Sequence, residues 1–172
     1  MSRAASSGRN GGADIGSFLI WGVVIWVHVI AAVTWAGGMI FVTVVLMPGL
    51  RGLPGHLRAS VLQRIGPGIK AAGWISILVL LMTGVLNVIH LQVQWNTFVG
   101  HLLAAKLSVL AAVLVLSALH DFVLGPRLMK QMEADSSDPS LGAGRKTLSW
   151  VARINLGLVL IVIFLAVLIA RS

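Results

Sequence analysis

The chain has 172 residues, of which 58% are hydrophobic and only 10% are charged. A soluble domain carries about a quarter charged residues, so this composition excludes an ordinary water-soluble globular protein. The sequence contains no cysteine, which excludes disulfides, iron–sulfur clusters and thiolate ligands to zinc or haem. The net charge of +8 comes from basic residues that flank apolar runs. This arrangement favours contact with anionic lipid headgroups, and we expect no nucleic-acid partner.

The apolar runs predict an all-α integral membrane protein with four transmembrane helices. About 20 helical residues cross a bilayer, and we expect such helices over about 18–47, 71–91, 98–124 and 148–170, packed as a four-helix bundle. The polar residues Gln92, Gln94, Asn96 and Thr97 separate the second helix from the third. Residues 1–16 are rich in Ser, Gly and Arg and are predicted to be a disordered tail before the membrane domain of residues 17–172.

The loop charges predict the orientation of the helices. The second loop has no charged residue, whereas the first and third loops each hold a set of basic residues: Arg51, Arg58, Arg64 and Lys70, and Arg127, Lys130, Arg145 and Lys146. Cytoplasmic loops are enriched in Lys and Arg, so we expect both termini on the outer, periplasmic side of an inner (plasma) membrane. Within the first loop, apolar residues recur at helical spacing over about 56–65, which predicts an amphipathic helix in the interface.

Polar residues inside the first predicted helix lie on one face. Trp21, His28 and Trp35 are spaced by seven, and Met39 follows four residues later. Gly38 follows Trp35 closely and permits close approach by another helix or a flat ligand. An ionisable side chain in the bilayer costs a few kcal/mol unless it finds partners, so His28 is either a ligand or a packing histidine bonded to the backbone.

The other helices add further candidates. The second helix has a polar stripe of Ser76, Thr83, Asn87 and His90, which also fits interhelical hydrogen bonding. Depth along the helices predicts an outer cluster of His28, His90, His101 and Lys106, and an inner cluster of His120, Asp121, Arg153 and Asn155. Two purely structural alternatives remain open: Lys106 extends its ammonium group to the membrane surface, and Asp121 forms an ion pair with Arg153.

These side chains leave two ligand chemistries open. His and Met residues suit soft Cu(I), for which the candidate ligands are His28, His90, His101 and Met39. Paired histidines between helices suit haem b, with basic residues for its propionates. The candidate cofactor-binding residues for either ligand are His28, Trp35, Gly38, His90, His101, Lys106, His120 and Arg153.

The order of motifs resembles the copper-resistance protein D (CopD) family. The string from His28 to Gly38 is similar to the family's H-x3-A-x2-W-x-G-G signature, and Thr83-Gly84, Thr97-Phe-Val-Gly100 and Lys106-Leu107 follow in family order. The segment from Ser117 to Leu128 resembles the end of the family's third helix, with His120-Asp121 where the family usually has Asn-Arg. The resemblance implies a membrane protein that handles copper.

A more distant resemblance is to HemJ-type protoporphyrinogen oxidases, which are also four-helix membrane proteins. It rests on His28 and Trp35 in an H-x6-W-x-x-G pattern and on Lys106-Leu107 followed by His120. It implies a b-type haem with His28 as a ligand. The sequence thus carries three hypotheses: copper binding or translocation, a haem-binding redox protein linked to quinone, and an accessory subunit of a larger membrane complex. A homo-oligomer is compatible with all three.

Overall fold

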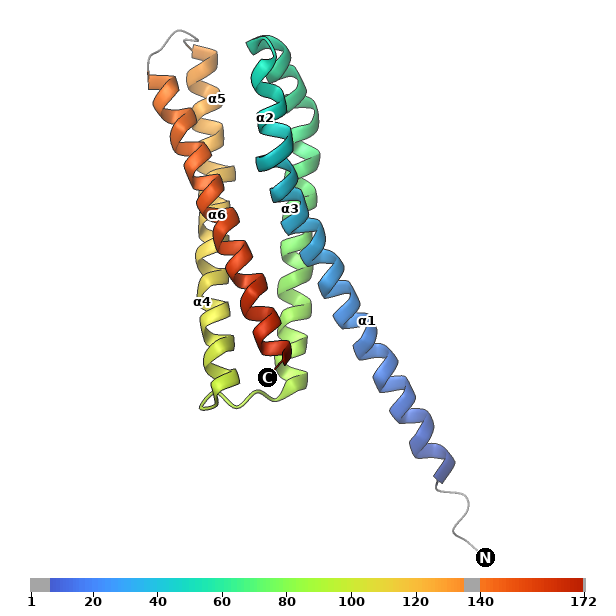
Figure 1. The fold of residues 1–172 in the computed structure, drawn as a ribbon. Helices are drawn as coiled ribbons and strands as arrows, with labels where there is room; N and C mark the ends of the chain where they lie inside the picture. The colour runs from blue at the N-terminus through green and yellow to red at the C-terminus, as the bar shows by residue number, and fades with distance from the viewer. Residues whose placement is uncertain (1–6, 135–139, 172) are drawn as a thin grey trace, which may run out of the picture. The chain divides into compact units, whose positions relative to one another are not determined.

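The computed structural model describes residues 7–134 and 140–171, and within them the chain is helical, with no strand (Figure 1). Four segments of the described chain are long and apolar enough to cross a membrane: Ile15–Gly52, Gly55–Leu91, Phe98–Leu128 and Leu141–Arg171. Many of the most exposed side chains are large and apolar, such as Phe18, Val115 and Phe164. The predicted all-α membrane class is therefore confirmed.

The first span starts earlier than the sequence predicted. Helix α1 covers Ser7–Ile40 and continues into the π-helical segment η1 (Phe41–Leu46), the short helix α2 (Met47–Gly49) and the 3₁₀ turn η2 (Leu50–Gly52). Residues 7–16, predicted as part of a disordered tail, are thus helical, because an existing helix adds one hydrogen bond for each residue it orders. Residues 1–6 of that tail lie outside the described residues.

The second span is one helix, α3 (Gly55–Leu91), with Pro67 inside it. The sequence predicted a separate interfacial helix over about 56–65. That stretch is helical, but it runs into the membrane span without a break. Proline removes one backbone hydrogen bond, and neighbouring groups in a membrane helix satisfy the carbonyl that it leaves. Helix α3 ends where Gln92 adopts a positive φ of 45°.

The third and fourth spans follow a short loop. Helix α4 (Phe98–Ala118) begins after Thr97, whose hydroxyl accepts a hydrogen bond from the backbone N–H of Gly100 (3.2 Å). It passes into the π-helical segment η3 (Leu119–Leu124) and then α5 (Gly125–Ala134). Helix α6 (Ser140–Arg171) is the last element.

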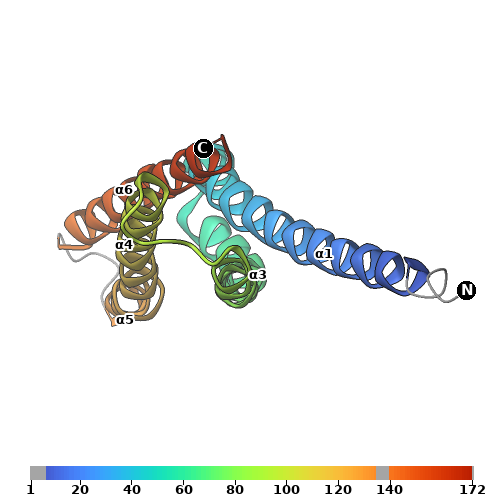
Figure 2. The ribbon, with the colours of Figure 1, turned by 90° about the horizontal axis from the view of Figure 1, so that it is seen from below.

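The chain divides into two compact units. Unit 1 contains the residues up to Trp35 and Ala71–Gln92, and unit 2 contains Ala36–Lys70 and the residues from Val93 onward. In unit 2, α4 and α6 lie side by side in both views (Figures 1 and 2). Their interface contains the two most buried large side chains, Val113 and Val159.

Candidate functional site

His28 is held by a hydrogen-bonded chain inside unit 1. Its Nδ1 lies 2.7 Å from the Thr83 hydroxyl, which donates to the Val79 carbonyl oxygen 2.6 Å away. A hydroxyl has one proton, so the Thr83 oxygen accepts from the Nδ1–H of His28. The lone pair of the neutral imidazole then lies on Nε2. The ring also lies close to Gly84, where a β-carbon would be 3.6 Å from Cε1.

His90 belongs to a second contact of the same helix pair. Its ring stacks on Trp21 with the ring centroids 3.7 Å apart and the planes 19° apart. Moving seven residues back along α1 from His28 to Trp21 corresponds to seven residues forward along α3 from Thr83 to His90, so the segments are antiparallel in one register. The two histidines are therefore two turns apart, about 10 Å along the axis, and do not face a common metal ion in this arrangement.

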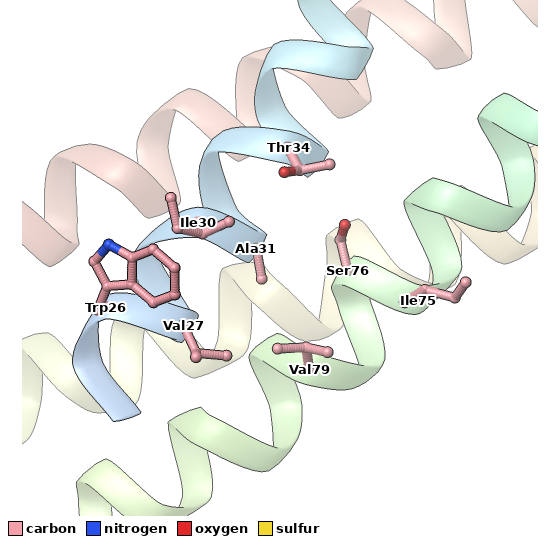
Figure 3. A pocket seen from close by; sticks show the side chains of 8 residues that line it. All are labelled: Trp26, Val27, Ile30, Ala31, Thr34, Ile75, Ser76 and Val79. Atoms are coloured by element: carbon pink, nitrogen blue, oxygen red, sulfur yellow. The ribbon is translucent and has the colours of Figure 1, made fainter. Parts of the chain in front are cut away.

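An open groove of about 250 Å³ lies between the same two segments (Figure 3). Its lining is mostly apolar, and the hydroxyls of Thr34 and Ser76 are among its few polar groups. Trp35, predicted to adjoin a ligand, is 7% exposed and lies in unit 1. By the register of the His28–Thr83 pair, Trp35 is level with the buried Ser76.

The remaining outer candidates belong to unit 2. His101 is exposed near the start of α4, and Lys106 and Met39 are half-buried. A β-carbon built on Gly38 would meet no atom of another described segment within 4 Å.

The inner cluster is resolved into separate contacts within unit 2. His120 Nδ1 and Asp121 Oδ1 lie 2.8 Å apart, within hydrogen-bond distance, and about a third of each side chain is exposed. Arg153, which the sequence offered as a partner of Asp121, lies over the ring of Trp150, with its guanidinium carbon 5.7 Å from the centroid.

A buried polar pair joins α4 and α6. Asn155 Nδ2 donates to the Ser117 hydroxyl at 2.8 Å, and the two residues are 4% and 8% exposed. Asn155 Oδ1 is buried without a hydrogen-bond partner among the described residues. Leu128 and Gly144 also approach each other closely. Leu128 lies eleven residues after Ser117 and Gly144 lies eleven residues before Asn155, so the two contacts fit one antiparallel register.

Lys70 is a functional candidate that the sequence reasoning missed. Its ammonium donates to the Asp121 carbonyl oxygen at 3.1 Å and lies 4.1 Å from the centroid of Phe122. Both partners lie in η3, and π-helical segments inside α-helices frequently occur at functional sites. The sequence had placed Lys70 only among the basic loop residues. Its position next to the apolar run that starts at Ala71 was the available signal.

The donor atoms limit the metal sites that this chain can form. Among the side chains that the structure describes, no three His, Asp or Glu residues gather closely enough to hold a metal ion. A closed tetrahedral zinc site needs four such ligands. The imidazole of His28 and the thioether of Met39 are instead donor types that suit Cu(I), so the donor chemistry, though not a complete ligand set, is compatible with copper.

Comparison with known proteins assigns the family. The sequence model described as copper resistance protein D matches residues 70–169. An uncharacterized protein of Aquifex aeolicus (strain VF5) is 27% identical over 144 residues, which cover 83% of this chain and 90% of that protein. No solved structure matches. Since the family match covers more than half of a chain with four apolar helices, the protein belongs to the copper resistance protein D (CopD) family and is a multi-pass membrane protein.

Proposed function

We propose that this protein binds copper within the bilayer at His28 and passes the ion across or along the membrane. The observation that carries the proposal is the hydrogen-bonded chain from His28 through Thr83 to Val79. Such a chain orients an imidazole and fixes its tautomer, as the outer partners of metal-binding histidines do. Family membership supplies the link to copper.

His28 is the first of several proposed ligands. His90, Met39 and His101 are proposed as separate copper ligands and not as members of one site with His28. They rank behind His28, whose imidazole has the orienting hydrogen bond to Thr83. His90 is stacked on Trp21, and His101 is exposed. Copper enters here as the transported ion, and a site with few ligands suits an ion that must also leave.

The test is Cu(I) binding by the purified full-length protein in mild detergent, measured by competition with a chromophoric Cu(I) chelator. We expect His28→Ala to lose most of the affinity. The matched control is His56→Ala, because His56 is an exposed histidine at the start of α3. Circular dichroism and size-exclusion chromatography serve to check that both variants fold. If His28→Ala folds and binds Cu(I) like the wild type, the copper site at His28 is wrong.

An absorption spectrum before and after dithionite separates copper from the other two hypotheses. Copper binding predicts no haem bands in protein from haem-replete cells. A Soret band that shifts in His28→Ala would replace copper by haem b. Protein that binds neither ligand would favour an accessory role in a membrane complex.

We also propose that both termini lie on the outer side of the inner membrane. The sequence contains no cysteine, so a single cysteine introduced at either end gives an unambiguous label. Labelling of intact cells by an impermeant maleimide is expected at Arg171→Cys and not at Arg58→Cys. The reverse pattern would contradict the orientation.

A further inference from the structure

One exposed face of α6 combines two cations with an aromatic ring. Lys146, Trp150 and Arg153 are spaced by four and three residues, which places them on one side of the helix. All three are exposed, and Trp150 exposes 53% of its surface. The guanidinium of Arg153 lies 5.7 Å from the centroid of the Trp150 ring. We refer to these three residues as the α6 cationic face.

The position of this face along the helix matches a membrane–water interface. Beyond Arg153 the same side of α6 carries no charge for three turns, and it continues with the exposed residues Gly157, Ile161 and Phe164. Tryptophan is enriched at the headgroup level of a bilayer. A side chain of a helix leans toward the helix N-terminus, and the contact of Arg153 with Trp150 has this direction. Arg153 therefore extends from the apolar region toward Trp150 and Lys146.

The two positive charges of the α6 cationic face favour an anionic ligand. Helix α6 contains no Asp or Glu from Ser140 to Arg171, so neither cation has an acidic neighbour on its own helix. An arginine fork matches the geometry of phosphate oxygens. A phosphate level with Trp150 would have one cation a turn above it and the other a turn below it.

We propose that Lys146, Trp150 and Arg153 form a binding site for the headgroup of an anionic phospholipid. The lipid belongs to the leaflet in which α6 begins, and its acyl chains run along the apolar side that follows Arg153. The residues of this site belong to unit 2, whereas His28 and Thr83 of the proposed copper site belong to unit 1.

The experiment measures which lipid lies beside Trp150. The full-length protein is reconstituted in phosphatidylcholine bilayers, and a fixed fraction of the lipid is replaced by brominated phosphatidylglycerol or by brominated phosphatidylcholine. Bromine quenches tryptophan fluorescence at short range, and the difference between wild type and Trp150→Phe isolates the signal of Trp150. The wild type is expected to be quenched more strongly by the brominated phosphatidylglycerol.

Two variants decide the outcome. Each of Lys146→Gln and Arg153→Gln is expected to lower the preference for the anionic lipid about fivefold, since each cation near an anionic surface contributes about 1 kcal/mol. The control Arg171→Gln removes the same charge at the other end of α6 and is expected to leave the preference unchanged. Equal quenching by the two brominated lipids in the wild type, or an unchanged preference in both variants, would overturn the site and leave an ordinary solvated face.

Discussion

Replacing Thr83 by valine tests how His28 is oriented. Valine has nearly the shape of threonine but no hydroxyl, so the change removes the acceptor of the His28 Nδ1–H at 2.7 Å without opening a cavity. The Val79 carbonyl loses a side-chain donor but keeps the Thr83 backbone N–H that bonds it in α3. The perturbation is therefore confined to the imidazole.

The structure bounds the size of the effect. Thr83 is 8% exposed, so the hydrogen bond lies largely out of water. Hydrogen bonds between membrane helices contribute about 0.6 kcal/mol on average, and a buried donor left without an acceptor costs about 1–3 kcal/mol. We therefore expect Thr83→Val to lower the free energy of unfolding by about 0.6–3 kcal/mol. Loss of the outer partner of a metal-binding histidine lowers metal affinity about 10–100-fold.

The assay is Cu(I) competition on Thr83→Val, with Thr83→Ser as the matched control that restores the hydroxyl. Thr83→Val is expected to bind about 10–100-fold more weakly than the wild type, and Thr83→Ser to bind nearly as well. If Thr83→Val keeps full affinity while His28→Ala loses it, the ligand assignment survives but the orienting role of Thr83 is refuted.

Three further predictions concern the stability of unit 2. A β-carbon at Gly100 would lie 2.6 Å from a backbone oxygen of the preceding loop, so Gly100→Ala is expected to lose about 1–3 kcal/mol in thermal or denaturant unfolding. Gly157→Ala, where the β-carbon meets no described atom within 4 Å, is the control, and equal losses in the two would refute the clash. Ser117→Ala leaves both polar ends of the buried Asn155 amide unpaired and is expected to cost about 1–3 kcal/mol of stability. Asn155→Leu removes the whole amide, including its unpaired oxygen, and should cost less. The opposite order in an unfolding assay would contradict this account. Lys70→Met is expected to cost about 1 kcal/mol and to accelerate hydrogen exchange in η3, because it removes the bond to a backbone carbonyl and the contact with a ring; unchanged exchange there would count against it.

The spans could be predicted because membrane insertion depends on a local property. The length of an apolar run, compared with the bilayer thickness, is read directly from the residues in order. The ends of the helices were less accurate. The sequence predicted a separate interfacial helix over about 56–65, yet α3 continues through Pro67, because one lost backbone hydrogen bond does not end a helix that continues on both sides.

The faces of the candidate site were also predictable, but its contacts were not. Spacings of seven placed His28 and Trp21 on one side of the first helix, and Thr83 and His90 on one side of the second. Which of these residues meet depends on the register between the helices, and a shift of one turn would pair them differently. For Ser117 and Asn155 a signal was present, since both lie at similar distances from the segment that connects α5 and α6.

The sequence by itself determined the helical membrane class, the four spans and the histidine that the family motif contains. Only the tertiary structure decided that Thr83 orients His28, that His90 stacks on Trp21 two turns away, and that Lys70 holds η3. The physical reason is the separation along the chain. Hydropathy acts over about 20 neighbouring residues, whereas the hydrogen bond of His28 joins residues 55 positions apart. Its partner is set by how two helices pack, which no run of neighbouring residues encodes.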